Sequence, residues 1–196
     1  MTPTRLSLLV VGTAILVLLV VGLFQLHGSP SGSGEPKLTL AEMHARLLGS
    51  PPALTGLHEQ ASEILSGGLP ALDARLAALK GLPVVINKWA SWCGPCRAEF
   101  GALQTASVAD GRRVAFIGID SGDTSRADAI AFLRSFPVSY PSYYDESGQA
   151  GEAITDSTFT PVTVFYDPEG HEYIHQGPYP SAAKLQADIS RYALDG

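Results

Sequence analysis

Cysteine is scarce in this sequence, because Cys93 and Cys96 are the only two among 196 residues. A framework of several disulfides is therefore excluded, and the pair supplies only two of the about four ligands that a structural zinc site needs. The histidines form no second paired motif that would complete such a site. Covalent haem attachment requires a histidine directly after the second cysteine, and Arg97 occupies that position.

Positive charge is also sparse in this chain. It has 13 lysines and arginines against 19 aspartates and glutamates, for a net charge of −6, and it contains no block of like charges. Proteins that bind nucleic acids carry clustered basic residues. The composition therefore gives no support to nucleic-acid binding, and we expect no nucleic-acid partner.

The N-terminal part almost lacks charge, since Arg5 is the only charged residue among the first 34. As a helix rising about 1.5 Å per residue, the apolar run 6–26 spans the roughly 30 Å hydrocarbon core of a bilayer. It is longer than the apolar segment of a typical cleaved signal peptide, and neither a small-residue cleavage site nor a lipid-accepting cysteine follows it. We predict an uncleaved membrane anchor over residues 1–26, with a cleaved signal peptide as the alternative.

Arg5 also bears on the topology of this anchor, because positive residues that flank a membrane helix tend to stay in the cytoplasm. The short N-terminus would then lie in the cytoplasm, and the chain from residue 27 onward would lie outside it. This predicts a single-pass protein of the cell membrane whose folded part is extracytoplasmic.

Three further segments follow the apolar run. Residues 27–36 are rich in Gly, Ser and Pro, which is typical of a flexible linker. Residues 37–67 contain two stretches with helical spacing of apolar residues and predict a helical extension. Residues 68–196 alternate strand and helix patterns before a hairpin and a last helix, which favours an α/β sandwich with a mixed sheet.

The elements expected in this α/β segment follow from apolar runs and from the residues that bound them. Strands are predicted at 83–90, 112–120, 138–145, 161–167 and 172–177. Helices are predicted at 69–81, where an irregular turn is the alternative, and at 94–108, 125–136, 148–154 and 181–194. Ser125 or Thr124 is expected to cap the third of these helices, and Ser181 the last.

The segment NKWASWCGPCRAEF, residues 87–100, places both cysteines between a predicted buried strand and a helix. Cys93 would lie at the helix N-terminus, where unpaired N–H groups and the helix dipole favour its thiolate. Cys96 lies three residues later on the same face and can attack a mixed disulfide held by Cys93. Pro95 costs no hydrogen bond in the first turn. A redox pair is favoured over a structural disulfide, which would close only a short loop and stabilise weakly.

The stretch WASWCGPCRAEF resembles the active-site segment of the thioredoxin superfamily, in particular the membrane-anchored thiol:disulfide oxidoreductases of the TlpA/ResA/CcmG type. STFTPVTVFYDPEG is similar to the family segment that carries a cis-proline, here Pro161, and Gly177 matches the glycine after the last strand. The resemblance covers about residues 68–196. It implies a thioredoxin-like sandwich with a mixed central sheet, preceded by one N-terminal transmembrane helix.

The resemblance also implies roles for individual residues. Thr160 and Pro161 would face the cysteines, with a cis bond that exposes the Thr160 backbone to an extended substrate segment. From the strand pattern alone, Pro161 would be an ordinary proline at a strand start. Glu99 matches the acidic residue of the family's CxxCxxE pattern and would relay protons. From spacing alone Glu99 is a solvated helix carboxylate, so both interpretations stay open.

Four residues near the cysteines complete the predicted site. Asn87 stands where ordinary thioredoxins have a buried aspartate, so proton transfer would use Glu99, water or the substrate. Lys88 points either outward or towards the thiols, and a surface lysine is favoured. Trp89 is predicted to be a core residue, and Trp92 part of an apolar platform that contacts substrate.

The function that the resemblance implies is thiol:disulfide exchange on protein substrates outside the cytoplasm, by Cys93 and Cys96 and without a cofactor or metal. It favours reduction, with electrons from a membrane thiol-transfer protein of the CcdA or DsbD kind and apocytochrome c as a candidate substrate. The direction depends on the potential of the pair relative to its partners, which the sequence does not fix. The alternative is a metal or apoprotein chaperone of the same fold without redox turnover, although the C-G-P-C spacing counts against it.

Overall fold

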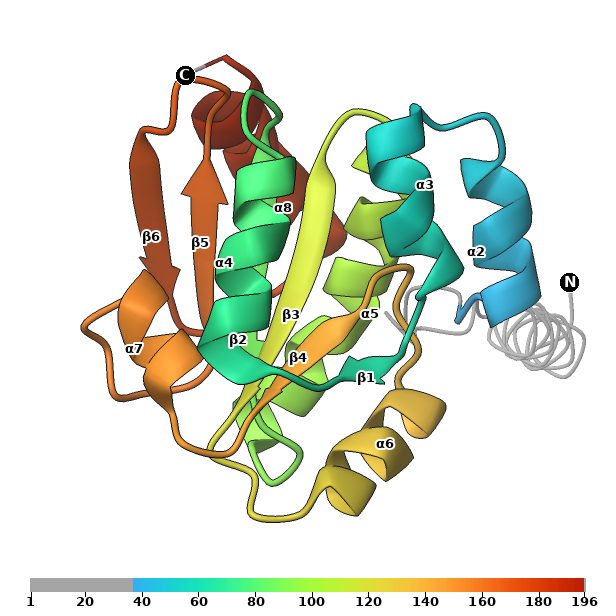
Figure 1. Ribbon diagram of the computed structural model, residues 1–196. Coiled ribbons are helices and arrows are strands. Elements are labelled where there is room, and N and C mark those ends of the chain that lie inside the picture. The colour runs from blue at the N-terminus through green and yellow to red at the C-terminus, as the bar shows by residue number, and fades with distance from the viewer. Residues whose placement is uncertain (1–36, 196) are drawn as a thin grey trace, which may run out of the picture. The chain divides into compact units, whose positions relative to one another are not determined.

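The computed structural model describes residues 37–195 (Figure 1). The predicted membrane anchor, residues 1–26, and the predicted linker, residues 27–36, lie outside the described residues and stay predictions. Within residues 37–195, no helix combines the length and the apolar character needed to cross a bilayer.

A mixed sheet forms the centre of the fold, as predicted, with the strand order β1-β4-β3-β2-β5-β6. Neighbours among β1, β4, β3 and β2 are parallel, whereas β5 runs antiparallel to both β2 and β6. The strands are β1 Ile64–Leu65, β2 Val84–Trp89, β3 Ala115–Ser121, β4 Ser142–Asp145, β5 Val162–Tyr166 and β6 Glu172–Gln176. Parallel neighbours need crossover connections, and here helices supply them.

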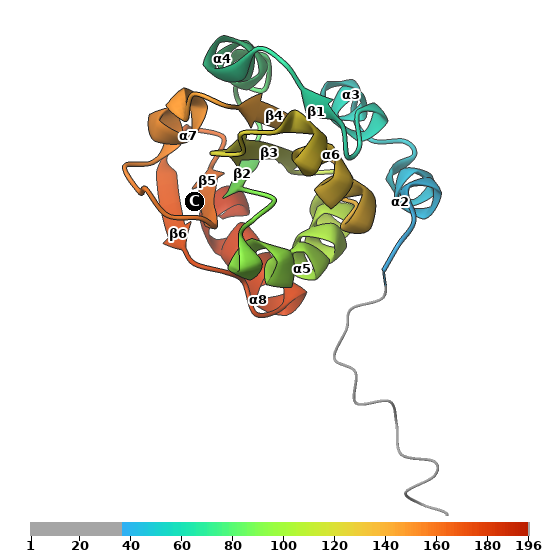
Figure 2. The ribbon, with the colours of Figure 1, turned by 90° about the horizontal axis from the view of Figure 1, so that it is seen from below.

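Helices cover both faces of this sheet, with α4 on one side and α5 and α8 on the other (Figure 2). One apolar cluster lies beneath α3, α4 and α7, and a second lies beneath α5, α6 and α8. The helices are α2 Leu40–Leu47, α3 Pro52–Glu59, α4 Gly68–Ala78, α5 Gly94–Asp110, α6 Arg126–Ser135, α7 Gln149–Ile154 and α8 Ala182–Ile189, and a π-helical turn, Ser190–Leu194, continues α8. Strand β2 is buried on both faces as a result.

Side-chain caps fix where several helices begin. The Ser125 hydroxyl accepts from the backbone N–H of Asp128 at 3.3 Å, and the Ser181 hydroxyl accepts from that of Lys184 at the same distance. Both were predicted as caps, because serine supplies an acceptor to N–H groups that lack a partner within the helix.

The segment 37–67 contains the two predicted helices, α2 and α3, and also a strand that was not predicted. Strand β1 pairs in parallel with β4 at the edge of the sheet. Ser62 connects the chain before β1 to the chain before β4, because its hydroxyl accepts from Val138 N–H at 2.8 Å and donates to the Val138 carbonyl at 2.9 Å. The segment therefore completes the sheet edge beside β4 instead of only packing on the domain.

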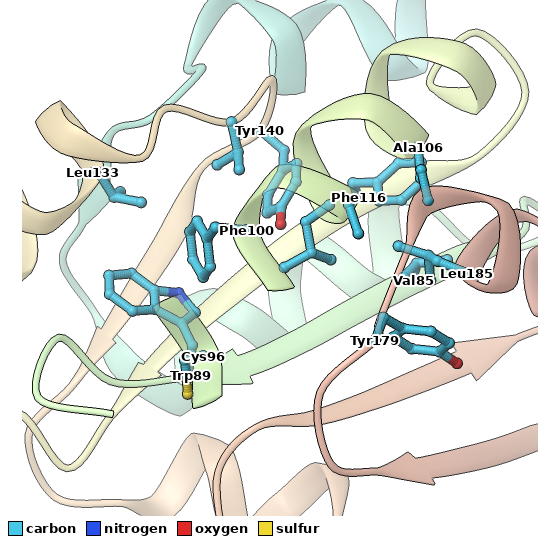
Figure 3. Close-up of a cluster of buried hydrophobic side chains, with 14 of the residues drawn as sticks. Val85, Trp89, Cys96, Phe100, Ala106, Phe116, Leu133, Tyr140, Tyr179 and Leu185 are labelled. Carbon is cyan, nitrogen blue, oxygen red and sulfur yellow. The ribbon is translucent and has the colours of Figure 1, made fainter. Parts of the chain in front are cut away.

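Aromatic side chains fill the core next to the cysteines. Trp89 stacks on Phe132 with ring centroids 4.8 Å apart and meets Phe100 edge to face at 5.3 Å. Figure 3 shows Cys96 beside this group, at the end of α5 nearest β2. The prediction of Trp89 as a core residue is confirmed, and its indole N–H donates to the Ser142 hydroxyl at 3.1 Å.

Candidate active site

The two cysteines lie where strand β2 passes into helix α5. Cys93 is the N-cap of α5 and Cys96 lies in its first turn, and the two form a disulfide with an S–S distance of 2.04 Å. The Cys93 sulfur accepts from the Cys96 backbone N–H at 3.0 Å. The predicted position at the helix N-terminus is confirmed, and this N–H would stabilise a Cys93 thiolate after reduction.

Access to the pair is restricted. Cys93 is 3% exposed and Cys96 is fully buried. The neighbouring Trp92 is 67% exposed, and its indole N–H donates to the Gly122 carbonyl at 3.2 Å. Of the two cysteines only Cys93 has any exposed surface, and the exposed Trp92 is its neighbour in sequence.

The segment before β5 lies opposite Cys93. The Thr160–Pro161 peptide bond is cis, as the resemblance implied, and the Thr160 carbonyl oxygen lies 3.6 Å from the Cys93 sulfur. Pro161 is buried, and its carbonyl accepts from Gly177 N–H at 3.0 Å, which ties it to the end of β6. The structure therefore brings Thr160 and Pro161 to the disulfide, as predicted.

Glu99 is fully buried behind the disulfide, and this contradicts the alternative of a solvated helix carboxylate. One carboxylate oxygen accepts from the Asn87 side-chain amide at 2.8 Å, and the other accepts from Tyr179 N–H at 3.0 Å. Burial raises the pKa of Glu99 to about 7, although these two hydrogen bonds act in the opposite direction. Glu99 therefore exists in both protonation states near neutral pH.

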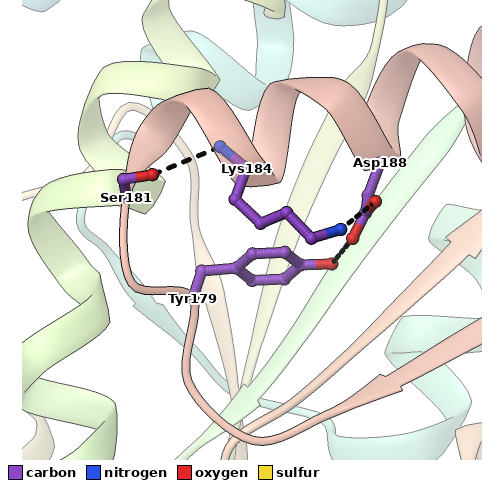
Figure 4. A network of polar contacts seen from close by, with 4 residues as sticks. All are labelled: Tyr179, Ser181, Lys184 and Asp188. Atoms are coloured by element: carbon purple, nitrogen blue, oxygen red, sulfur yellow. Dashed lines mark hydrogen bonds and ion pairs between the residues drawn. The ribbon is translucent and has the colours of Figure 1, made fainter.

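Tyr179 is a site residue that the sequence analysis missed. Its hydroxyl donates to Asp188 at 2.9 Å, and Asp188 also pairs with Lys184 at 2.5 Å (Figure 4). The backbone of Tyr179 is thereby held where its N–H meets Glu99. Nothing local in the sequence signals this contact, since the two residues are 80 positions apart.

Two buried aspartates lie near the end of β3, and one of them, Asp123, braces the loop that leads to Cys93. Asp123 accepts from the backbone N–H of Ser91 at 2.9 Å and from its hydroxyl at 3.0 Å. Asp120 is fully buried and neither of its oxygens has a hydrogen-bond donor. Burial, followed by the neighbouring Asp123, raises the pKa of Asp120 to about 9, so it is protonated at neutral pH. The sequence analysis singled out neither residue.

The predicted position of Lys88 is wrong. Lys88 is only 5% exposed, and its ammonium group donates to the Ser157 carbonyl at 2.7 Å. Burial lowers the pKa of Lys88, and the negative charges of Asp145 and Glu152 act against this shift. The local expectation failed because β2 is buried on both faces, so neither orientation of a β2 side chain leads directly to solvent.

A metal site is not visible in the described part of the chain. Within residues 37–195, no group of three or more His, Cys, Asp or Glu side chains is arranged to hold a metal ion. The arrangement at Cys93 and Cys96 is that of a dithiol/disulfide pair beside a buried carboxyl group.

Comparison with known proteins gives the same assignment. The Redoxin family model matches residues 69–171. The chain is 34% identical over 122 residues to the thiol:disulfide interchange protein DsbE of Allochromatium vinosum, covering 58% of this chain and 64% of DsbE. It is 30% identical over 96 residues to the thiol-disulfide oxidoreductase ResA of Bacillus subtilis, covering 48% of this chain and 52% of ResA. The matches thus span between about half and two thirds of these relatives.

The fold is shared with solved thioredoxin-like structures. A thioredoxin family protein of Chlorobium tepidum superposes with a TM-score of 0.53 at 22% identity, covering 59% of this chain and 82% of that one. At this identity the likeness concerns the fold alone. Together with the family match over more than half of the chain, the cis-proline and the buried CxxCxxE glutamate, it shows that this chain belongs to the Redoxin family and is of the thioredoxin-like TlpA/ResA/CcmG type.

Proposed function

We propose that this protein carries out thiol:disulfide exchange on protein substrates through Cys93 and Cys96. One observation carries the proposal: the pair begins helix α5, faces the Thr160 carbonyl and has the buried Glu99 behind it. A structural disulfide has no need of such a carboxyl group, whereas thiol chemistry needs a group that gives and takes protons near pH 7.

The exchange runs in two steps when the pair starts reduced. The Cys93 thiolate attacks one sulfur of a substrate disulfide, forms a mixed disulfide and releases the other substrate sulfur as a thiolate. The Cys96 thiolate then attacks the Cys93 sulfur, which forms the intramolecular disulfide and releases the second substrate thiolate. Two electrons pass from the protein to the substrate, and the same steps in reverse oxidise a substrate dithiol.

Glu99 serves this chemistry as a proton carrier. Cys96 must lose a proton before it attacks, and the departing thiolates take up protons afterwards. A carboxyl group whose pKa is about 7 can do both near neutral pH. Its place in α5, three residues after Cys96, sets it on the same helical face as that thiol.

The substrate would be an extended protein segment beside the disulfide. The Thr160 backbone, presented next to Cys93 by the cis bond, would pair with the main chain of that segment, and the exposed Trp92 would contact its side chains. Main-chain pairing accepts many sequences, so selectivity would come from the side chains that meet Trp92.

The direction and the cellular place of the exchange extend this proposal. We propose reduction outside the cytoplasm by a membrane-anchored protein, with a CcdA- or DsbD-like electron donor and apocytochrome c among the substrates. The apolar run 6–26 supports the membrane anchor, and the relatives named as a thiol-disulfide oxidoreductase and a thiol:disulfide interchange protein support the exchange chemistry.

The decisive experiment traps the mixed disulfide. The full chain carrying Cys96→Ala is expressed in cell envelopes, where it should accumulate disulfide-linked proteins that mass spectrometry identifies. The adducts should disappear when Cys93→Ser is added. Adducts that persist without Cys93 would contradict its role, and a reduction potential in the range of strong oxidants would contradict the reductase direction.

A chaperone without redox turnover remains the competing function. It predicts one-to-one copper binding that survives dialysis, together with thiols that do not react with disulfides. The proposed exchange predicts consumption of a disulfide substrate and no retained copper after dialysis.

A further inference from the structure

Adjacent residues of β2 reach opposite faces of the sheet, because side chains alternate along a strand. Asn87 contacts Glu99 on the α5 face. Lys88 extends to the other face, to the segment 155–160 that leads into β5. A single strand thus contacts the proton-carrying side of the site and the substrate-carrying side.

The segment 155–160 has few other restraints. Ser157 N–H donates to the Thr155 hydroxyl at 3.1 Å, and Phe159 N–H donates to the Ser157 hydroxyl at 3.3 Å, so both contacts are local. Phe159 is 75% exposed. The hydrogen bond from Lys88 to the Ser157 carbonyl, at 2.7 Å, connects this segment to the sheet 69 positions away.

Burial of the Lys88 ammonium group costs free energy, which favours a functional reason for its position. A buried charge loses hydration, and the Ser157 carbonyl together with the negative charges of Asp145 and Glu152 returns only part of that free energy. An apolar side chain of the same length would fill the space without the cost. Because Thr160 follows Ser157 by only three residues and its carbonyl lies beside Cys93, the hydrogen bond restrains the group that would hold the substrate.

Helix α7 leaves space for the Lys88 side chain at Gly151. A Cβ atom at Gly151 would lie 2.9 Å from Lys88 Cε and 2.6 Å from the Ser121 hydroxyl oxygen. Alanine would normally stabilise a helix relative to glycine by about 1 kcal/mol. The absence of a side chain at Gly151 leaves the path by which Lys88 reaches Ser157.

We propose that Lys88 is a positioning residue for substrate binding, which fixes the segment 155–160 so that the Thr160 backbone is presented to a protein substrate beside Cys93. A groove of about 510 Å³, lined by Lys88, Trp92, Glu152, Ser157 and Thr160 among others, is the space that the substrate would enter. The inference rests on the proposed exchange function. It assigns Lys88 an effect on extended substrates that a small disulfide, which needs no backbone pairing, does not experience.

The test compares two substrates in the full chain: a disulfide-bridged peptide of about ten residues and 4,4′-dithiodipyridine. Lys88→Met keeps the length of the side chain and removes the donor. We expect KM for the peptide to rise about tenfold with little change in kcat. The rate with dithiodipyridine should change less than twofold, and the reduction potential should stay at the wild-type value. The exposed Lys80→Met is the matched control, for which both substrates should react as with the wild type.

A second pair of variants displaces Lys88 and keeps its charge. Gly151→Ala should raise KM for the peptide in the same way, whereas Gly101→Ala, in α5 where a Cβ meets no atom within 4 Å, should not. Equal losses with both substrates, or no loss with either, would overturn the proposal.

Amide hydrogen exchange, measured on the oxidised protein, tests the role of Lys88 independently of the thiol:disulfide exchange function. Lys88→Met should speed amide exchange in residues 155–160 and leave α5 unchanged. Unaltered protection of 155–160 overturns the role of Lys88 even if turnover is normal. Failure of the wild type to react with either disulfide overturns the exchange function instead.

Discussion

The two ends of the central sheet are built from different chemistry. The carboxyl ends of β2, β3 and β4 hold buried polar side chains, namely Asn87, Lys88, Asp120, Asp123 and Asp145. The opposite end, where β2 and β3 begin, is more apolar, with Leu79, Val84 and Val114 buried, and the aspartates buried there, Asp110 and Asp167, are hydrogen-bonded. In open α/β sheets ligands bind at the carboxyl ends of strands, so the end that carries the reaction is also the end where burial is costly.

Buried polar atoms without a hydrogen-bond partner are a second difference between the two ends. Among the described residues, five buried side-chain atoms have no hydrogen-bond partner, and three of them belong to Asn87 and Asp120. Such atoms cost free energy, so the apolar end must supply stability that the reactive end lacks. The comparison predicts that substitutions at one end change stability alone, and that substitutions at the other end can raise stability while changing the chemistry.

Leu79→Ala at the apolar end should have the largest effect on stability. Leu79 is 2% exposed, and removal of a buried leucine side chain leaves a cavity. The free energy of unfolding should fall by about 2–5 kcal/mol, measured by urea denaturation of the oxidised protein. The reduction potential should stay at the wild-type value; a shift would show that the two ends are not independent.

Asp120→Asn should stabilise the protein above neutral pH. The native pKa of about 9 exceeds the unfolded value of 3.8, so the native state keeps a proton that the unfolded state releases. Stability is therefore lost as pH rises from about 4 to about 9. Asparagine does not titrate. The variant should therefore be more stable than the wild type at pH 8, and the difference should shrink towards pH 4 by up to about 1.4 kcal/mol per pH unit.

A stability difference between Asp120→Asn and the wild type that does not change with pH would contradict the raised pKa of Asp120.

Glu99→Gln should change stability less and catalysis more. Here too the native pKa, about 7, exceeds the ordinary value of 4.5, so wild-type stability falls as pH rises between these values. The variant should lack this fall, which in the wild type amounts to at most about 1.4 kcal/mol per pH unit. Its exchange rate should drop about tenfold or more, and the dependence of that rate on pH near 7 should flatten. An unchanged pH profile would exclude Glu99 as the proton carrier.

Trp92→Ala should have the smallest effect on stability. Its side chain is 67% exposed, so the free energy of unfolding should change by no more than about 0.5 kcal/mol. KM for the disulfide-bridged peptide should rise nonetheless, because the apolar surface beside Cys93 is lost. A large loss of stability would instead assign Trp92 to the core.

The central strands and the cysteine motif could be predicted from the sequence because their signals are local. Strand β2 is a run of apolar and β-branched residues, and the turn into Cys93 follows directly. The two-residue strand β1 has no such pattern, because two positions show no alternation. Its pairing depends on Ser62 contacts with a segment 76 positions away, which no local pattern contains.

The site residues divide in the same way. Cys93, Cys96 and Pro161 could be identified from motifs, and Glu99 only with the help of a resemblance. The partners that give Glu99 its properties could not be identified, since Tyr179 arrives from a distant turn through its backbone. Lys88 was misplaced because a lysine in a strand suggests a polar face, and only the packed helices show that both faces are covered.

The contact between Tyr179 and Glu99 has a consequence for mutational tolerance. The donor is a main-chain N–H, which every amino acid except proline carries. Substitution at position 179 can therefore move this donor but, proline apart, cannot delete it. A change at position 179 can therefore shift the pKa of Glu99 only by moving this donor, whereas a change at Asn87, whose side chain is the other donor, can remove a donor altogether.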